Sequence, residues 1–380
     1  MFQSRQRALG LSFVLAVSVI WVVASFLVQD LEQLGVHPVV VTAVSNSLFA
    51  VYLPVYFLSR FLSRAGAGAT TADTSASLSA PPSVKLAGDR VDLPSFADWK
   101  EDWRGALGVL WDNQLFRAAV HVAPLWFFAQ LTFNASLAAT SVTSNTILSS
   151  TSSLFTFLFS VVMLSERFTY FKLGCIVSLM LGTAMVVSSD GIGARGDGGG
   201  EGEGEGGGGA AGGSRSVYGD LLCVVSAVLY GMYTVSIRKR IQGDDEAVPM
   251  TLFFSFMGVL IFLTTVPVLL ILGLVGVPLG ALSWSIFGLL VLKGCLDNVL
   301  SDYLWARSIL LIGPTLATSG LALQVPIAVV SDALISRPAW MGDLVTILLT
   351  TIGGSVILGA FFGLNLESAG EEDSGGALDI

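Results

Sequence analysis

The sequence has few charged residues for its length. Charged side chains make up 12% of the 380 residues, which is about half of the roughly 25% found in soluble domains. A soluble globule of this size needs a charged surface to stay in solution, whereas a lipid bilayer removes that need. The scarcity of charge therefore argues against a soluble domain.

Cysteine and histidine are also scarce. Cys175, Cys223 and Cys295 each lie within an apolar run, none is spaced as CxxC, and the sequence has only two histidines, His37 and His121. This pattern excludes a structural zinc site and a disulfide framework, so the cysteines are expected to be small buried hydrophobic residues. We also find no nucleophile–base pair, metal-ligand set or cofactor motif, and we predict no enzyme activity, catalytic residue, metal or cofactor.

A basic surface is missing as well. The formal net charge is −9, which argues against binding to nucleic acid because that requires basic patches. The acidic residues gather in loops and near the C-terminus, where Glu371, Glu372 and Asp373 follow one another. Residues 364–380 are therefore expected to form an acidic disordered tail.

Long hydrophobic runs are what the sequence has in abundance, since 53% of its residues are hydrophobic. A membrane-spanning helix needs about 20 mostly apolar residues. Ten segments meet this requirement: 9–28, 37–59, 118–139, 142–164, 169–189, 217–237, 250–272, 282–306, 309–334 and 341–363. The first is long for a signal peptide, lacks a clear cleavage site and is followed by further spans. We predict an all-α polytopic membrane protein with ten transmembrane helices.

Two long connections divide the chain. Residues 60–117 begin rich in Gly, Ala and Ser and end with charges and tryptophans, so we expect a cytosolic flexible linker followed by an amphipathic helix at the membrane interface. Residues 190–216 contain the tract GDGGGEGEGEGGGG, which is expected to be a disordered lumenal loop. The chain then consists of a five-helix half over 1–189 and a second five-helix half over 217–363.

The charge pattern predicts that the second half is inverted. With the N-terminus in the cytosol, 15 of the 19 Lys and Arg residues fall on the cytosolic side and three on the other side, so the positive-inside rule places both termini in the cytosol. A fixed offset of 170 residues aligns Asn145 with Thr315, Ser149 with Ser319, and Arg167 with Arg337. Arg167 and Arg337 then lie on opposite sides, as an inverted repeat requires.

The eighth predicted span, 282–306, carries ionisable residues near the middle of the membrane. Lys293 and Asp297 are four residues apart and can pair on one helix face, Asn298 adjoins them, and Asp302 falls on the opposite side of a regular helix from Lys293. Charges inside a span are functional candidates. Lys293 could receive an anionic substrate, or Asp297 or Asp302 could carry a proton. The alternative is a buried structural ion pair that fixes helix packing.

The fourth predicted span, 142–164, is rich in hydroxyl groups. Thr146, Ser149, Ser150 and Ser153 follow the spacing of one helix face. They are expected to line a cavity, to pack closely against another helix, or both. Asn145, Ser149, Thr315 and Ser319 are the candidates for the walls of the site.

Two segments of the chain resemble a known family. Residues 140–173, TSVTSNTILSSTSSLFTFLFSVVMLSERFTYFKL, and residues 292–334, with DNVLSDYLWA at 297–306, resemble the F subfamily of solute carrier family 35. That subfamily is part of the drug/metabolite transporter superfamily with EamA-type halves. The resemblance implies a transporter in an endomembrane, Golgi or vacuole rather than plasma membrane. Nucleotide-sugar motifs such as GALNK are not found.

We therefore predict a secondary transporter that moves a small polar or anionic metabolite by alternating access, with its site near the midplane around Lys293 and Asp297. The expected partners are the small-molecule substrate and the lipid bilayer, with a homodimer as a further expectation. The alternative is a non-transporting membrane scaffold or receptor in which the Lys–Asp pair is structural.

Overall fold

The chain folds into a bundle of long helices. A computed structural model describes residues 2–32, 37–58, 103–137, 139–140, 142–196, 212–241, 250–276, 283–335 and 341–376. The main helices are α1 (Phe2–Glu32), α2 (Pro38–Ser47), α5 (Trp103–Asp112), α6 (Gln114–Leu137), α7 (Val142–Ser149), α8 (Ser152–Leu164), α9 (Tyr170–Gly196), α10 (Gly212–Arg240), α11 (Met250–Leu274), α12 (Trp284–Gly294), α13 (Ser301–Ile312), α14 (Pro314–Gly320), α15 (Gln324–Ile335) and α16 (Leu344–Gly376). Most of the predicted linker, and the centre of the Gly/Glu tract, lie outside the described residues.

Nine helical segments of the described chain are long and apolar enough to cross a membrane. The predicted fold class, an all-α polytopic membrane protein, is therefore confirmed. The predicted segment 118–139 is not among the nine, because α6 carries Arg117, His121, Gln130 and Asn134 within its 24 residues. This helix nevertheless lies inside the bundle and packs against α10, α11 and α2.

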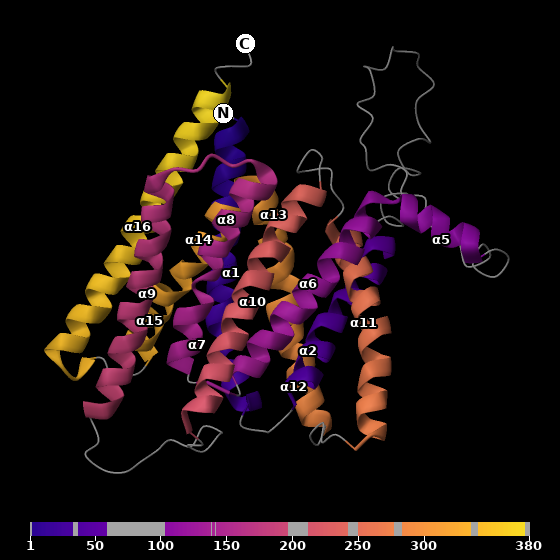
Figure 1. Cartoon of the computed structure of the whole chain (residues 1–380), viewed down its shortest axis with the longest axis horizontal. Helices are drawn as coiled ribbons and strands as arrows, with labels where there is room; N and C mark the ends of the chain where they lie inside the picture. The colour runs from indigo at the N-terminus through magenta and orange to yellow at the C-terminus, as the bar shows by residue number, and fades with distance from the viewer. Residues whose placement is uncertain are drawn as a thin grey trace, which may run out of the picture.

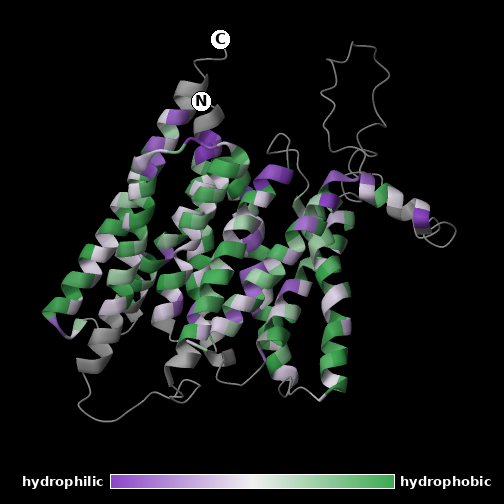
Figure 2. Cartoon of the chain, viewed as in Figure 1, coloured by the Kyte–Doolittle hydropathy of each residue, from purple (hydrophilic) through white to green (hydrophobic). Residues whose placement is uncertain are grey.

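The two termini lie at the same end of the bundle (Figure 1). Hydrophobic residues cover the long flanks of the helices, and hydrophilic residues gather towards that end, which we call the termini side (Figure 2). Helix α5 points sideways from the bundle on the termini side (Figure 1). It falls within the segment 60–117, whose end is predicted to form an amphipathic helix at the membrane interface. Asn113 lies between α5 and α6 and accepts hydrogen bonds from the backbone N–H groups of Leu115 and Phe116.

Four of the spanning segments are broken. In the second, a 3-10 turn, η1 (Leu48–Val51), separates α2 from the helical residues 52–58. A turn at Ser150 and Thr151 separates α7 from α8, and a π-helical turn, η2 (Cys295–Leu300), separates α12 from α13. A 3-10 turn, η3 (Leu321–Leu323), separates α14 from α15. In a membrane, freed backbone groups at such breaks are tolerated where neighbouring helices or a wet cavity satisfy them.

The boundary between the eighth and ninth spans differs from the prediction. Helix α13 continues to Ile312, six residues beyond the predicted end at 306, and α14 begins at Pro314. Gly313 lies between them with φ of 80°, a conformation that glycine adopts readily. The following proline can start a helix but cannot continue one. The Gly–Pro pair, rather than the end of the apolar run, therefore sets the boundary.

The predicted acidic tail is helical over most of its length. Helix α16 extends to Gly376, well beyond the predicted end of the span at 363. Arg7 of α1 donates hydrogen bonds to Asn365, and Lys172 of α9 forms an ion pair with Glu371. These contacts hold the extension against two neighbouring helices. Helices α9 and α10 likewise reach into the predicted loop 190–216, to Gly196 and from Gly212.

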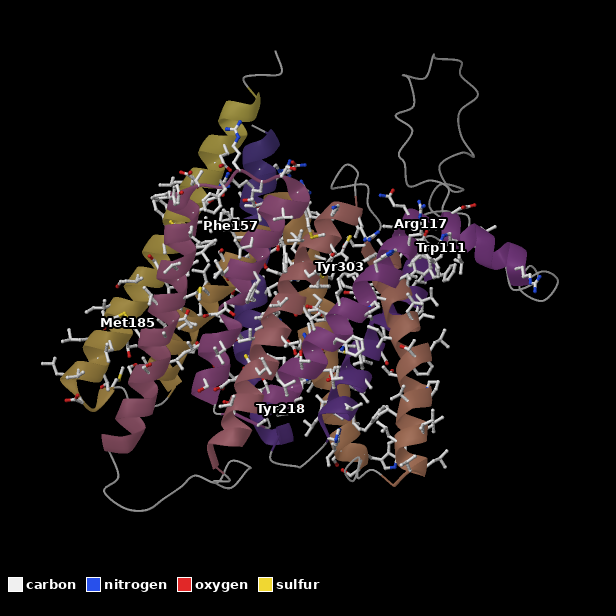
Figure 3. All side chains as sticks on the ribbon, in the orientation of Figure 1. Trp111, Arg117, Phe157, Met185, Tyr218 and Tyr303 are labelled. Atoms are coloured by element: carbon white, nitrogen blue, oxygen red, sulfur yellow. The ribbon has the colours of Figure 1, made fainter. Side chains whose placement is uncertain are left out.

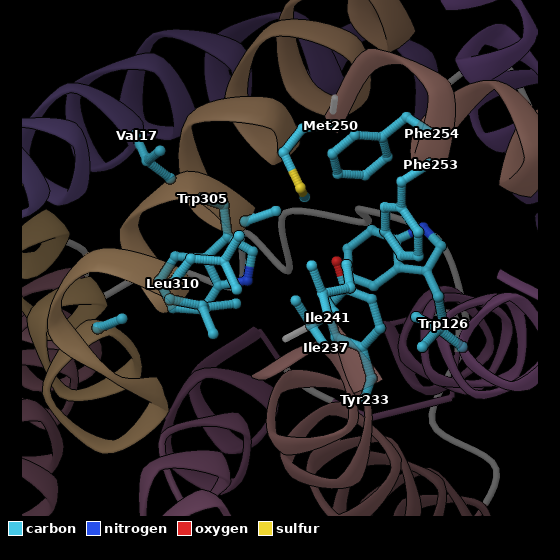
Figure 4. Close-up of a cluster of buried hydrophobic side chains, with 14 of the residues drawn as sticks. Val17, Trp126, Tyr233, Ile237, Ile241, Met250, Phe253, Phe254, Trp305 and Leu310 are labelled. Carbon is cyan, nitrogen blue, oxygen red and sulfur yellow. The ribbon is translucent and has the colours of Figure 1, made fainter. Parts of the chain in front are cut away.

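The interior of the bundle is rich in aromatic side chains. Trp126 of α6 lies 4.6 Å from Tyr233 of α10 between ring centroids, and Trp305 of α13 is fully buried nearby. Figure 4 shows this cluster between α6, α10, α11 and α13. In Figure 3, Tyr303 lies in the interior of the bundle, whereas Arg117 and Trp111 lie at the termini side, where α5 meets α6. Aromatic packing fills the interior on the termini side, and the cavity described below lies further from the termini.

Candidate functional site

A polar cavity lies between the two halves of the chain. It encloses about 260 Å³ and is lined from α1, α6, α7, α8, α9, α10, the π-turn η2, α14, η3 and α15. Hydroxyl and amide groups dominate its polar lining: Gln130, Thr146, Ser149, Ser150, Ser152, Ser153, Thr183, Ser226, Thr318 and Gln324. Three aromatic residues, Trp21, Phe133 and Tyr230, also line it. The rest of the lining is Asp297 and seven apolar residues: Ala129, Leu179, Met180, Ala227, Leu321, Ala322 and Val325. The arrangement can bind a small solute through several hydrogen bonds and a ring face.

The predicted hydroxyl face of the fourth span lines this cavity. Thr146, Ser149, Ser150 and Ser153 are all among the lining residues, so the helical spacing in the sequence identifies one side of the cavity. The break between α7 and α8 falls within this face. Ser153 also donates a 3.5 Å hydrogen bond to the backbone carbonyl of Thr318. This residue therefore both lines the cavity and packs against a neighbouring helix.

The cavity has one acidic lining residue. Asp297 is the only charged side chain among the described lining residues, and its Oδ2 lies 3.0 Å from Nζ of Lys293. The Lys293 side chain is 11% exposed and the Asp297 side chain 28% exposed. Lys293 is thus held behind Asp297 rather than in the lining, and a solute in the cavity meets the carboxylate first.

The π-turn η2 places the polar groups of the eighth span. Its Cys295–Leu300 segment contains Asp297 and Asn298. Because a π-helix pairs residues five apart rather than four, Asp297 and Asp302 are brought towards the same face of the broken helix. The Asp302 carboxylate interacts electrostatically with both Asp297 and Lys293. The prediction from a regular helix, with Asp302 opposite Lys293, does not account for this turn.

Asn298 belongs to a buried hydrogen-bond network rather than to the lining. Its Nδ2 donates a 2.8 Å hydrogen bond to Oδ1 of Asn46 in α2, which also accepts a 3.0 Å hydrogen bond from the indole of Trp126. The network ties the π-turn to α2 and α6. Ser301, at the start of α13, accepts a 2.8 Å hydrogen bond from the indole of Trp21, which orients that ring at the cavity.

The other predicted residues lie at different places in the bundle. Asn145 is buried where α6 meets α7, and its side chain donates to the hydroxyl of Ser136. Ser319 and Asp302 are buried, and neither is among the lining residues. Thr315 lies at the start of α14, where its hydroxyl donates a 2.6 Å hydrogen bond to Glu166. Their roles in substrate binding stay predictions.

Several lining residues were not predicted from the sequence. Trp21 and Tyr230 lie in apolar runs of α1 and α10, where an aromatic residue facing a cavity looks like one facing another helix. Ser226 and Thr183 are single hydroxyls in long apolar segments. Gln324 directly follows η3. A predicted break in the ninth span would have indicated that Gln324 could face the cavity.

On the termini side, ionic and polar contacts close the bundle. Lys172 lies 3.1 Å from Glu166 and 2.6 Å from Glu371, and Thr315 binds the other carboxylate oxygen of Glu166. We call Glu166, Lys172, Thr315 and Glu371 the latch. It joins the end of α8, the start of α9, the start of α14 and the end of α16. Arg238 of α10 donates to the backbone carbonyl of Leu310 in α13, a contact within the second half of the chain.

A metal site is not apparent in the described part of the chain. Among those residues, no group of three or more His, Cys, Asp and Glu side chains could hold a metal ion. The three cysteines have no disulfide partner. The polar groups of the cavity are suited to binding a solute through hydrogen bonds.

Comparison with known families finds a match within the first half of the chain. Residues 94–188 match the EamA-like transporter family, so the resemblance drawn from the sequence motifs is confirmed. The family is one of transporters rather than enzymes, which agrees with the prediction of no enzyme activity.

Curated proteins similar to the chain are also membrane or transport proteins. An uncharacterized vacuolar membrane protein of Saccharomyces cerevisiae is 32% identical over 260 residues, which cover 65% of the chain and 60% of that relative. An uncharacterized transporter of Schizosaccharomyces pombe is 28% identical over 87% of the chain and 89% of its own length. Solute carrier family 35 member F5 of Mus musculus is 25% identical over 87% of the chain and 72% of its own length.

A solved crystal structure of a protein has the same fold. It aligns with 97% of the chain and 99% of its own length, at a TM-score of 0.54 and 15% sequence identity. At this identity the likeness concerns the fold alone.

Proposed function

We propose that this chain, whose residues 94–188 match the EamA-like transporter family, is a secondary transporter that carries a small polar metabolite across an internal membrane by alternating access. The observation that supports this most directly is the polar cavity between the two halves, with Asp297 in its wall near the middle of a membrane-spanning segment. Binding sites near the midplane at a repeat interface are typical of such carriers.

The lining favours a neutral or cationic solute over an anionic one. Asp297 is the charged group that the described lining presents, and Lys293 is held behind it at 3.0 Å. An anion in the cavity would meet the carboxylate before the ammonium group and would be repelled. Hydroxyl, amide and aromatic groups can recognise a polar solute that carries a flat ring. We therefore prefer a hydroxylated or amine-bearing metabolite to the anionic alternative.

A ten-helix arrangement is part of the proposal. Termini on the same end of the bundle require an even number of crossings (Figure 1), and α6 supplies a tenth crossing beside the nine apolar segments. Its polar side chains are accommodated inside the bundle. The Asn134 side chain, for example, donates a 2.8 Å hydrogen bond to Thr42.

The helix contacts support two inverted five-helix halves. In an inverted repeat, spans one to five correspond to spans six to ten, so each contact should have a counterpart. The third span packs on the sixth (α6 with α10), and the eighth packs on the first (α13 with α1). The second span packs on the seventh, the fourth on the ninth and the fifth on the tenth. Exchange of the two halves turns each of these pairs into the same pair. The pairings fit one twofold relation.

The contacts also suggest which side of the carrier is closed. By the positive-inside rule the termini side is cytosolic, and the latch closes it. The lining residues come from the middle of the spans and from the part away from the termini, such as Trp21 of α1 and Thr146 of α7. We propose that the conformation described is closed towards the cytosol, and that the latch opens when the carrier turns inward.

The membrane in question is proposed to be an endomembrane, Golgi or vacuole. The similar Saccharomyces cerevisiae protein is named for the vacuolar membrane, and another relative from that yeast, 27% identical over 341 residues, is named a thiamine-repressible mitochondrial transport protein. An internal membrane is common to both names. A homodimer is compatible with the many apolar residues exposed on the outer faces, which equally fit lipid.

Transport is tested with the full chain in liposomes. A panel of radiolabelled amines, nucleosides, sugars and anionic nucleotides is offered to the wild type, to Asp297→Asn and to the control Glu367→Gln, which makes the same chemical change outside the cavity. We expect uptake of a neutral or cationic solute by the wild type and the control, and its loss in Asp297→Asn. Absence of any uptake in a folded protein would favour the scaffold or receptor alternative.

A further inference from the structure

Behind the cavity, the structure holds a carboxylate with no partner. Asp302 in α13 is 1% exposed, and neither of its carboxylate oxygens has a hydrogen-bond partner among the described residues. Asp302 does not line the cavity. A buried ionised carboxylate without hydrogen bonds or a paired cation costs several kcal/mol on insertion scales. The group therefore requires something that the other side chains do not supply.

Three other polar groups around Asp302 lack partners as well. The hydroxyls of Tyr230 and Tyr233 in α10 and the indole nitrogen of Trp305 in α13 are buried and make no hydrogen bond to any described residue. Tyr230 and Tyr233 interact electrostatically with Asp302. The ring of Tyr230 lies 5.9 Å from that of Tyr233 and 6.2 Å from that of Trp305. Several unpaired polar groups gathered in one buried place are unusual, since native structures satisfy nearly all such groups.

The nearest charged groups do not neutralise Asp302. Lys293 interacts with it but is committed to Asp297 at 3.0 Å, and Asp297 adds a like charge. Tyr52 also interacts with Asp302, yet its hydroxyl donates to the backbone carbonyl of Val299. Of the other helices that contact α13, α11 and α14 contain no ionisable residue and those of α1 lie towards its ends. Three basic residues of α10 lie in its last turn, where Arg238 donates to Leu310. On α13 itself, Arg307 lies five residues after Asp302.

We propose that Asp302 binds a proton in the conformation described, and that its protonation and deprotonation couple solute transport to a proton gradient. A protonated carboxyl group is neutral, which removes the cost of an unpaired buried charge. This inference rests on the proposed transport function and adds the identity of the coupling ion to it.

Tyr230 and Asp297 form the connection between the cavity and Asp302. Both residues line the cavity, and both interact electrostatically with Asp302. A proton can thus pass from water in the cavity to Asp302 through groups that themselves give and accept protons or hydrogen bonds. A proton taken up from water on one side is released to water on the other. The step breaks one O–H bond for each that it forms and needs no oxidant or reductant.

The geometry also explains how solute and proton would compete or cooperate. A solute bound at Asp297 changes the field at Asp302 because the π-turn η2 brings the two carboxylates together. A cationic solute would favour the charged form of Asp302 and so promote release of the proton. In this scheme the coupling is the free energy of interaction between a solute bound at Asp297 and the proton bound at Asp302.

The test needs no transported solute. The full chain is placed in lipid vesicles, and infrared difference spectra are recorded as the pH is changed, for the wild type and for Asp302→Asn, Asp302→Glu, Asp297→Asn and the control Glu367→Gln. We expect a carbonyl band of a protonated carboxylic acid at neutral pH. It should be absent in Asp302→Asn, shifted in Asp302→Glu and retained in Glu367→Gln. In Asp297→Asn it should weaken, because Lys293 loses its partner and the like charge beside Asp302 is removed.

A band that persists in Asp302→Asn, or no such band in the wild type at neutral pH, would overturn the proposal. Thermal unfolding shows whether each variant is folded, and Asp302→Glu serves if the asparagine variant is not. Once the liposome panel identifies a solute, a pH gradient should stimulate its uptake by the wild type and leave uptake by Asp302→Asn at the rate without a gradient. If the wild type transports a solute but shows no infrared band, proton coupling through Asp302 is refuted and the proposed transport function stands. If the band is present but no solute is transported, the proposed transport function is refuted.

Discussion

Gly182 of α9 and Gly353 of α16 meet backbone to backbone where the two helices cross. A Cβ added to Gly182 would lie 2.8 Å from the carbonyl oxygen of Gly353, and one added to Gly353 would lie 2.8 Å from that of Gly182. The contact is reciprocal, and the residues are 171 apart, close to the 170-residue offset between the halves. In the inverted repeat proposed above, residues close to the twofold axis would meet in this reciprocal way. A second contact joins the same two helices: the hydroxyl groups of Ser189 in α9 and Thr350 in α16 form a 2.6 Å hydrogen bond.

Replacing Gly353 with valine should destabilise the pairing of α9 and α16. The added side chain would meet backbone atoms of Gly182 that cannot rotate away, and overpacking of this kind costs about 1–3 kcal/mol. Gly354→Val is the matched control, because a Cβ there meets nothing within 4 Å and the change in helix propensity is the same. Thermal unfolding in detergent measures the difference. Equal losses in the two variants would contradict the close contact.

Glu371→Gln should loosen the latch. Lys172 is 1% exposed, so loss of one of its two carboxylate partners leaves a buried ammonium group less well satisfied, at a cost on the order of 1–3 kcal/mol. Amide hydrogen exchange over residues 164–172 and at the start of α14 should then become about tenfold faster or more. Glu367→Gln, one helical turn earlier on α16, is the control. Similar exchange in both variants would show that the latch does not hold this end closed.

The sequence predicts the bundle well but not the site. Hydropathy finds the spans because a bilayer demands about 20 apolar residues in each, and the Thr146–Ser153 face is visible because its hydroxyls repeat with the helical period. Tyr230 and Trp21 cannot be assigned in this way, since an aromatic residue that faces a cavity has the same pattern as one that faces a helix. Span boundaries fail where Gly313 and Pro314 override the apolar pattern.

The π-turn explains the largest difference between expectation and structure at the site. A regular helix puts Asp302 opposite Lys293, and one extra residue in a turn alters every angle beyond it. Nothing in the apolar pattern of the eighth span marks that insertion. The buried network of Asn298 with Asn46 and Trp126 is also hidden, because its members are far apart in the sequence and meet only through packing.

Asn46→Ala tests that network. Its Oδ1 accepts hydrogen bonds from both Trp126 and Asn298, and its removal leaves two buried donors unpaired, at about 1–3 kcal/mol each. We expect a clear fall in the unfolding temperature. Ser45→Ala is the neighbouring control, because the buried Ser45 hydroxyl has no partner in the described part of the chain and its loss should cost little. A larger effect at Ser45 than at Asn46 would refute the assignment.

Lys293 and Asp297 can be separated into a structural and a functional contribution by a double-variant cycle. Removal of one member of a buried ion pair leaves the other charge uncompensated and costs about 3–5 kcal/mol, whereas replacement of both by groups of similar volume is often neutral. Lys293→Met alone should therefore destabilise the protein strongly, and Lys293→Met with Asp297→Asn should restore the unfolding temperature. If the pair were only a packing device, the stable double variant would still take up a solute found with the wild type. We expect it to be stable and inactive, because Asp297 lines the cavity and its carboxylate faces the solute.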